Sequence, residues 1–361
     1  MRYIKRLMLK LTNECNLATC KYCYTQAKKP EAEKGLSLDI YKNLLLHLIN
    51  DQSYGKLEEL SLTGGEPFLR DDLIHLVDFA LSHKISTRIN TNGTLINKYL
   101  ARTMCYMAKK YHTPLIFQVG LDSAEKKIHE FIRGQDTFEK TIDGIKYLTT
   151  FKNNNTAISL RYTIMKKPFR KNNKIAFKDN FENVKDYVKL ADLLKVNKIK
   201  IRELLTSGYG CSLHNYIIPA EEVAKIQETF IDEIRKYSSL NLEIAWPCYF
   251  GISKPIPKEV KNRIRISSCK CLDYYLSVDV NGGIVGCILL IGHNEQYLGN
   301  ILKDDIVDVF NSSIANKMLK ERYRKGRKDA RCYAIDHAHE EAQIDVKKRE
   351  KEMKKSFSLV E

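Results

Sequence analysis

Three cysteines lie close together near the start of the chain, at Cys15, Cys20 and Cys23. They follow a short apolar run at residues 7–11 that is typical of a buried strand. Three thiolates from one loop can bind three irons of a [4Fe–4S] cluster and leave the fourth iron without a protein ligand. Zinc is the alternative, but a zinc site normally needs a fourth Cys or His nearby, and none follows Cys23 before His47. The spacing therefore favours an iron–sulfur cluster with one open position.

Three further polar motifs each follow a predicted strand. Glycines let a backbone approach a ligand closely, Glu66 can accept from an ammonium group, and Arg133 can clamp a carboxylate with its forked donors. Taken singly, each motif is typical of an ordinary turn, and Arg133 of a surface ion pair. All of them, however, lie at the carboxyl ends of predicted parallel strands, where α/β enzymes build their sites. The residues are Gly64, Gly65 and Glu66; Asn90 and Asn92; Asp122 and Ser123; and Arg133.

Strands that alternate with helices must position these motifs. Helical spacing appears at residues 38–49 and in the series Val184, Val188, Ala191 and Leu194. This α/β alternation predicts parallel βαβ units, in a barrel or an open sheet, and six units are two short of an eightfold barrel. The predicted strands cover residues 7–11, 57–63, 85–90, 115–121, 158–164 and 198–203.

The pattern changes after a helix that is predicted from Pro219 to about Lys236. Residues 241–300 contain turn signals and short β-like runs. Cysteines gather again here, at Cys269, Cys271, Cys287 and Cys332. We expect four parts: a core at 1–215, a linker helix at 216–240, a smaller cysteine-bearing module at 241–335 and a charged tail at 336–361.

The composition is that of a globular protein, with 43% hydrophobic and 29% charged residues among 361. No apolar run reaches the length of a membrane span, and the N-terminal apolar stretch is too short for a signal peptide, so we expect a cytoplasmic protein with no membrane partner. Ten cysteines in that compartment indicate metal binding or catalysis rather than disulfides. The net charge is +16, but no arginine-rich stripe with interleaved aromatic residues appears, which argues against a nucleic-acid partner.

In combination, the motifs resemble those of the radical S-adenosylmethionine (SAM) superfamily, in the branch with a C-terminal SPASM or twitch domain, over about residues 4–335. The resemblance rests on the Cys-Lys-Tyr-Cys-Tyr run, Gly-Gly-Glu-Pro, Thr-Asn-Gly, and Leu-Asp-Ser followed by Arg-Gly. One feature departs from the family pattern: four residues, not three, separate Cys15 from Cys20, and a bulge in the loop can absorb the difference. The resemblance implies a partial (β/α)6 TIM-type barrel with a smaller α+β SPASM/twitch-like domain.

The resemblance also implies a [4Fe–4S] cluster bound by Cys15, Cys20 and Cys23, with SAM chelating the open iron. An electron from the cluster then cleaves SAM, and the 5′-deoxyadenosyl radical removes a hydrogen atom from the substrate. A donor such as flavodoxin or ferredoxin would supply the electron. The resemblance implies that Gly64, Gly65 and Glu66 bind the methionine moiety of SAM and that Arg133 binds its carboxylate. Tyr22 and either Leu204 or Leu205 would contact the adenine, and Asp122 or Ser123 the ribose. Asn90 and Asn92 would form the floor of the pocket.

The later cysteines resemble the first half of a SPASM or twitch domain, which holds auxiliary [4Fe–4S] clusters. The resemblance implies at most one such cluster, bound by Cys269, Cys287 and Cys332. Its fourth ligand would be Cys271, Asp336, His337 or no residue. The alternative is that these cysteines are buried apolar residues without a cluster.

Relatives with this layout act on peptides or proteins, or on small carbohydrates and aminocyclitols. We expect a maturase of a ribosomally made peptide that performs crosslinking, epimerisation or oxidation, with an epimerase or dehydrogenase of a small carbohydrate or aminocyclitol as the alternative. An epimerase needs a hydrogen donor opposite the radical, for which Cys211 and Cys248 are candidates, although a buried structural role would suit either residue. A protein of another class, a non-catalytic iron–sulfur or zinc protein that binds nucleic acid or carries electrons, would leave SAM intact.

Overall fold

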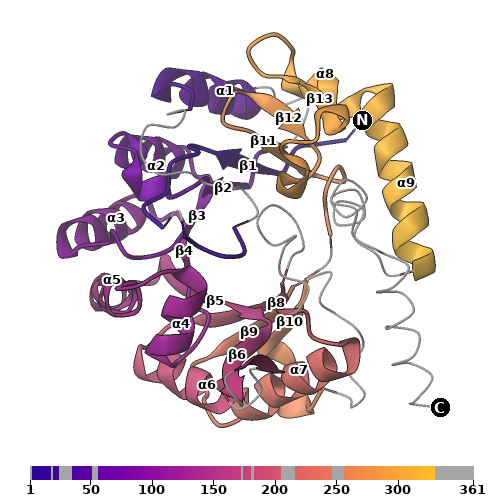
Figure 1. Cartoon of the computed structure of the whole chain (residues 1–361). Coiled ribbons are helices and arrows are strands. Elements are labelled where there is room, and N and C mark those ends of the chain that lie inside the picture. Colours follow the sequence, from indigo (N-terminus) through magenta and orange to yellow (C-terminus); the bar gives the residue numbers. More distant parts are fainter. Residues whose placement is uncertain are drawn as a thin grey trace.

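The computed structural model describes residues 2–17, 19–23, 35–50, 56–171, 174–179, 183–204, 216–245, 256–267 and 269–329. Within these ranges, a sheet of eleven strands organises the chain, in the order β10-β9-β8-β5-β4-β3-β2-β1-β11-β12-β13 (Figure 1). Every pairing from β10 through to β11 is parallel. The predicted α/β fold with a parallel, barrel-type sheet is therefore confirmed.

Six of the strands coincide with the apolar runs in the sequence. In β3 and β8, buried and half-buried residues alternate along the strand. The alternation arises because one face packs on helices while the other faces the interior of the barrel. The six strands are β1 (Arg6–Lys10), β2 (Glu59–Thr63), β3 (Ser86–Thr91), β4 (Leu115–Gly120), β5 (Thr156–Ile164) and β8 (Lys198–Glu203).

Helices between the strands cover the outer face of the sheet (Figure 1). Their apolar sides pack against the sheet and form the main core with it. In this core the ring of Tyr162 in β5 contacts two neighbouring rings edge to face, with centroid distances of 4.7 Å to Tyr187 and 5.2 Å to Phe230. In the part of the chain that the structure describes, no helix combines the length and the apolar character needed to cross a membrane. The helices are α1 (Leu38–Asn50), α2 (Leu73–Ser82), α3 (Lys98–Tyr111), α4 (Lys126–Arg133), α5 (Phe138–Phe151), α6 (Val184–Leu193) and α7 (Ala220–Ile234).

The sheet extends further than the sequence pattern predicts. Two short strands, β9 (Asn241–Ile244) and β10 (Ile264–Ile266), continue it beyond β8 with the same parallel sense. β9 and β10, which the sequence groups with the C-terminal module, therefore lie in the barrel sheet. A separate antiparallel pair, β6 (Lys166–Lys171) and β7 (Lys174–Asp179), lies between β5 and α6. All four strands are too short or too polar to show a clear period.

The C-terminal module is joined to the barrel through the first strand. Its strands β11 (Tyr275–Val278), β12 (Gly283–Val285) and β13 (Tyr297–Asn300) extend the sheet, because β11 pairs in parallel with β1. The helices α8 (Ile306–Asn311) and α9 (Ser313–Asp329) follow. The strand registers place Cys269, Cys271 and Cys287 toward the amino end of β1, whereas the first cysteine loop follows its carboxyl end.

Candidate functional site

The first cysteine motif forms the loop that leaves the carboxyl end of β1. Cys15 is buried, and its sulfur accepts a hydrogen bond from the Leu17 backbone N–H at 3.3 Å. The Cys20 N–H then donates to the Leu17 carbonyl oxygen at 3.0 Å, and the Cys23 N–H donates to the Cys20 carbonyl oxygen at 3.4 Å. The three thiols lie close enough to affect one another electrostatically. The loop therefore presents all three sulfurs to one region.

Burial disfavours the thiolate forms of Cys15 and Cys20. It raises the pKa of Cys15 to about 12 and that of Cys20 to about 11. A thiolate is the form that binds a metal, so each sulfur needs a cationic partner such as an iron ion to lose its proton at neutral pH.

Two glycines allow the turn after β2 to pack against this loop. The Gly65 N–H donates to the Thr12 carbonyl oxygen at 2.7 Å, and the Glu66 N–H donates to the Glu14 carbonyl oxygen at 2.7 Å. A Cβ atom on Gly65 would lie 1.8 Å from the Glu14 carbonyl oxygen, so only glycine fits there. Gly64 and Gly65 therefore position the backbone that leads into Cys15.

We expect Gly65→Ala to reduce the free energy of unfolding by about 3 kcal/mol or more, because backbone atoms rather than a flexible side chain must move. The displaced loop should also bind less iron after reconstitution. Gly299→Ala is the matched control, since its Cβ would meet the Asp304 and Val309 side chains at 2.9 Å. Urea denaturation and iron analysis check both variants, and equal losses in the two would contradict the role given to Gly65.

Glu66 is a buried residue whose backbone and side chain connect this loop to the end of β3 through hydrogen bonds. Its side chain is 0% exposed, and it accepts hydrogen bonds from the Thr91 hydroxyl at 2.7 Å and the Asn92 N–H at 2.8 Å. Burial raises the pKa of Glu66 to about 7 in spite of these donors. Its carboxyl group therefore orders the strand ends, and a contact with SAM's ammonium group stays a prediction.

Asn92 supports the cysteine loop directly. Its side-chain amide donates to Asn16 Oδ1 at 2.9 Å and to the Cys15 sulfur at 4.0 Å. Asn90 is directed elsewhere: its amide donates to the Ser61 hydroxyl at 3.0 Å, and its oxygen accepts from Gln118 Nε2 at 2.7 Å. The Asn92 side chain therefore supports the cysteine loop, whereas the Asn90 side chain lies in the interior of the barrel.

A buried triangle of polar side chains fixes the other side of the loop. The Tyr22 hydroxyl and Arg133 Nε both donate to Asp122 Oδ2 at 2.6 Å, and Arg133 Nη2 donates to the Tyr22 oxygen at 2.5 Å. Burial opposes ionisation of Asp122, but the charge of Arg133 outweighs it and lowers the pKa of that carboxyl group. Gly120 makes room for the guanidinium, because a Cβ there would lie 2.2 Å from Arg133 Nη2. Tyr22 lies between Cys20 and Cys23, so the triangle anchors the loop.

The remaining predicted SAM contacts are distributed around this triangle. Ser123 is buried, and its hydroxyl accepts from the Glu125 N–H at 2.9 Å. Leu204 is buried in a small apolar cluster with Tyr22 and Met165, beside Cys20. The predicted adenine contacts, Tyr22 and Leu204, are thus neighbours. Cys211, Cys248, Cys332 and Leu205 lie outside the described residues.

Three later cysteines converge in the C-terminal module. The Cys271 side chain forms hydrogen bonds with those of Cys269 and Cys287, and these contacts, with burial, place the pKa of Cys271 well above its ordinary value. The sequence named Cys271 as one of several options for a fourth ligand. Among the described residues Cys271 lies with Cys269 and Cys287, and the ligand set that includes Cys332 stays a prediction.

We expect Cys271→Ala to lower the iron content of anaerobically reconstituted protein from roughly eight to roughly four atoms per chain, since each [4Fe–4S] cluster holds four irons. The cluster at the first cysteine loop should remain. Iron and sulfide analysis measures the change. An unaltered iron content would show that Cys271 is not a ligand.

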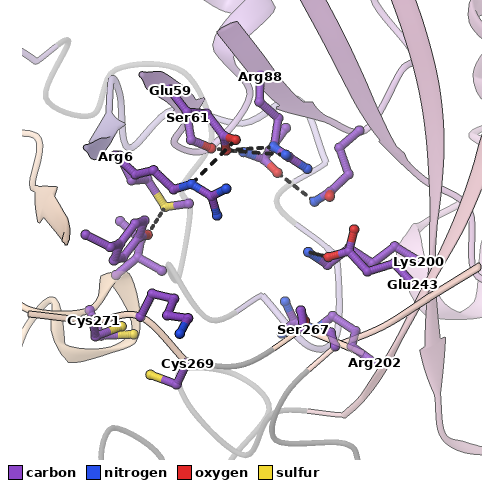
Figure 2. A pocket seen from close by; sticks show the side chains of 18 of the residues that line it. Arg6, Glu59, Ser61, Arg88, Lys200, Arg202, Glu243, Ser267, Cys269 and Cys271 are labelled. Atoms are coloured by element: carbon purple, nitrogen blue, oxygen red, sulfur yellow. Dashed lines mark hydrogen bonds and ion pairs between the residues drawn. The ribbon is translucent and has the colours of Figure 1, made fainter. Parts of the chain in front are cut away.

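A cavity of about 360 Å³ lies on the inner face of the sheet, between the barrel strands and these later cysteines (Figure 2). Charged side chains from opposite parts of the sheet line it, among them Arg6, Arg88 and Lys200. Sequence reasoning did not identify this lining. A pattern in the sequence could have revealed it, because a charged residue occupies every second position of otherwise apolar strands. Lys198, Lys200 and Arg202 of β8 are an example.

The first cysteine loop fits a [4Fe–4S] cluster by the chemistry of its donors and their setting. Its three sulfurs come from one loop, and burial leaves those of Cys15 and Cys20 in need of cationic partners. Within the described ranges, no three His, Cys, Asp or Glu side chains are grouped closely enough to bind one metal ion. A cluster distributes its thiolates over different irons, so it does not require such a group.

Comparison with known proteins agrees with this description. The chain matches the model of the radical SAM superfamily over residues 9–168 and that of an iron–sulfur cluster-binding domain, SPASM, over residues 269–334. Fe-coproporphyrin III synthase of Methanosarcina barkeri is 28% identical over 63% of this chain and 50% of its own length. Mycofactocin maturase MftC of Mycolicibacterium smegmatis is 24% identical over 82% of this chain and 67% of its own length. The crystal structure of Streptococcus suis SuiB bound to S-adenosylmethionine has a TM-score of 0.66 at 18% identity, over 89% of this chain and 68% of that one.

These findings define an iron–sulfur enzyme of the parallel-barrel type. The chain belongs to the radical SAM superfamily and carries a C-terminal SPASM domain. Its cofactors are accordingly a [4Fe–4S] cluster and SAM, with auxiliary iron–sulfur binding in the SPASM domain. The chain spans half of the length of the Methanosarcina relative and about two thirds of that of the maturase.

Proposed function

We propose that this protein cleaves SAM reductively and uses the resulting radical to remove a hydrogen atom from a peptide. The observation that carries the proposal is the buried cysteine loop after β1, which the Gly64–Glu66 turn and the Tyr22–Asp122–Arg133 triangle hold at the carboxyl ends of the strands. A cavity on the inner face of the same sheet is lined by residues from Arg6 and Glu59, which begin β1 and β2, to Cys269, Cys271 and Cys287. A substrate bound in that cavity would lie beside the later cysteines, inside the sheet whose strand ends carry the first cysteine loop.

The chain's own residues have distinct tasks in this proposal. When bound, the cluster supplies the electron that splits SAM into methionine and a 5′-deoxyadenosyl radical. Cys15, Cys20 and Cys23 hold the cluster, and Glu66 and Asn92 keep their loop in place. Tyr22 and Leu204 close an apolar wall beside the loop, which excludes water from one side. Positioning and exclusion of water are the main contributions of the protein to cofactor chemistry of this kind.

Two relatives support a peptide as the substrate. One is named a maturase, MftC. SuiB, whose fold this chain shares, has been solved bound to its precursor peptide SuiA with a TM-score of 0.63. The cavity is also lined by polar and charged groups, which suit a peptide better than an apolar molecule. A flavodoxin or ferredoxin would deliver the electron.

The test uses anaerobically reconstituted protein with dithionite, SAM and the small peptide encoded beside its gene. We expect 5′-deoxyadenosine and a change in mass or stereochemistry of the peptide. Formation of 5′-deoxyadenosine with no peptide modification would contradict the peptide assignment while leaving SAM cleavage intact. Intact SAM would contradict the whole proposal and favour a non-catalytic iron–sulfur protein.

A porphyrin is the second candidate substrate, because the Methanosarcina relative is named Fe-coproporphyrin III synthase. Coproporphyrin incubated under the same conditions should remain unchanged if the peptide assignment is correct.

A further inference from the structure

The cavity inside the barrel is strongly cationic. Among the described residues that line it are seven Lys or Arg side chains and two carboxylates. Strands from both halves of the sheet contribute, and the labelled side chains point toward a common open space (Figure 2). Six of the cations come from strands: Arg6, Arg88, Arg161, Lys200, Arg202 and Arg265.

The two carboxylates are already engaged by these cations. Glu59 lies between Arg6 at 3.8 Å and Arg88 at 3.3 Å. Glu243 lies between Lys200 at 2.8 Å and Lys198 at 3.1 Å, the latter outside the cavity lining. Each carboxylate is thus shared by two cations. The lining therefore retains an excess of five positive charges over its own acidic groups.

Two cations of the inner strand faces are largely shielded from water. The side chains of Arg88 and Lys200 are 17% and 22% exposed. Lys270, the seventh cation, lies between Cys269 and Cys271 at the module end of the cavity. Charges in a concave, partly desolvated site attract an anion more strongly than the same charges on an open surface.

Gln118 of β4 and Arg161 of β5, which both line this cavity, each carry one buried polar atom without a partner among the described residues. Gln118 is 7% exposed, and its Oε1 atom has no hydrogen-bond partner among the described residues. Arg161 Nε is buried and is likewise without a partner within that part of the chain. A ligand that satisfied both would offer a hydrogen-bond donor to Gln118 and an acceptor to Arg161. Buried polar groups normally find such partners.

We propose that the barrel cavity binds an acidic segment of the peptide substrate, with two or more Asp or Glu carboxylates facing the arginines. This proposal rests on the function proposed above and names the chemistry of the segment that enters the barrel. A peptide supplies what the site lacks, because its carboxylates can accept from Arg161 and its backbone N–H groups can donate to Gln118. Arginine is suited to this task, since its planar fork can bind a carboxylate through two parallel hydrogen bonds.

The porphyrin alternative matches this lining less well. The propionates of a porphyrin would satisfy the cations, but a metallated ring has no N–H group to offer to Gln118.

The test measures binding of a synthetic peptide of alternating glycine and glutamate, labelled with a neutral dye, to anaerobically reconstituted protein by fluorescence anisotropy. A peptide with glutamine in place of glutamate reports the contribution of charge. We expect the glutamate peptide to bind at least about tenfold more tightly than the glutamine peptide. Arg161→Gln combined with Arg265→Gln should weaken binding of the glutamate peptide at least about tenfold.

Arg102→Gln is the matched control, because it removes the same charge from an exposed position of α3 outside the cavity. Arg265 is also exposed, so Arg265→Gln alone tests the proposal should the Arg161 substitution disturb folding. Equal affinity for the two peptides, no binding of either, or equal effects of the Arg265 and Arg102 substitutions would overturn the proposal. Tighter binding of iron coproporphyrin, with the same loss in the double variant, would overturn it in favour of the porphyrin. Failure of the proposed function would instead appear as intact SAM in the wild-type protein.

Discussion

Replacing Cys20 by alanine is expected to reduce SAM-dependent formation of 5′-deoxyadenosine by at least about a hundredfold. The reason is that three thiolates must hold the cluster for its fourth iron to stay open to SAM. Among the described later cysteines none can substitute for Cys20, because Cys269, Cys271 and Cys287 lie toward the amino end of β1 and Cys20 follows its carboxyl end. Chromatographic measurement of 5′-deoxyadenosine after reduction with dithionite gives the rate.

Cys105→Ala is the matched control for this experiment. Cys105 is another buried thiol, 1% exposed, but it lies within α3 in the main core. Its replacement should cost some stability and leave the reaction rate within about a factor of two, because it contacts neither group of clustered cysteines. Equal activity in the Cys20 and Cys105 variants would remove the basis for the cluster assignment.

Asp122→Asn is expected to lower the free energy of unfolding by about 3–5 kcal/mol, because it leaves the Arg133 guanidinium buried without a charged partner. The two side chains are 0% and 5% exposed, so solvent cannot compensate for the loss. The effect should extend to the site, since Tyr22 would lose an acceptor next to Cys20 and Cys23. Urea denaturation measures the stability, and iron analysis measures the loss at the site.

A surface ion pair provides the control for this prediction. Lys5 and Glu58 lie 3.0 Å apart with side chains 47% and 55% exposed, so Glu58→Gln should change stability by no more than about 0.5 kcal/mol. Adding Arg133→Met to Asp122→Asn should recover part of the lost stability, because the uncompensated charge is then gone. A double variant no more stable than Asp122→Asn alone would show that packing, rather than charge, dominates at this position.

The sequence was sufficient to predict those parts of the site whose residues lie close together along the chain. The loop from Cys15 to Cys23 and the Gly64–Glu66 turn each lie within a few residues of a strand that its apolar run identifies. Parallel strands bring their carboxyl ends to one edge, so the shared location of the motifs follows from the order of the elements. The six main strands were predictable for the same reason.

Contacts between distant residues were not predictable in this way. The resemblance assigned Arg133 to the carboxylate of SAM, but nothing in the spacing indicated that it would pair with Asp122 and Tyr22, which is 111 residues away. The two short strands β9 and β10 have too few residues to show a period. The grouping of Cys271 with Cys269 and Cys287 also depends on the folded module, because sequence spacing alone does not fix the direction of a thiol.

The central claim is that Cys15, Cys20 and Cys23 hold a [4Fe–4S] cluster whose open iron binds SAM. Electron paramagnetic resonance of the reduced protein tests it most directly, in a variant with alanine at Cys269, Cys271 and Cys287, so that any remaining signal comes from the first cysteine loop. We expect a [4Fe–4S] signal whose g values change when SAM is added. A signal that SAM leaves unchanged, or one that persists when Cys15, Cys20 and Cys23 are also replaced, would contradict the claim.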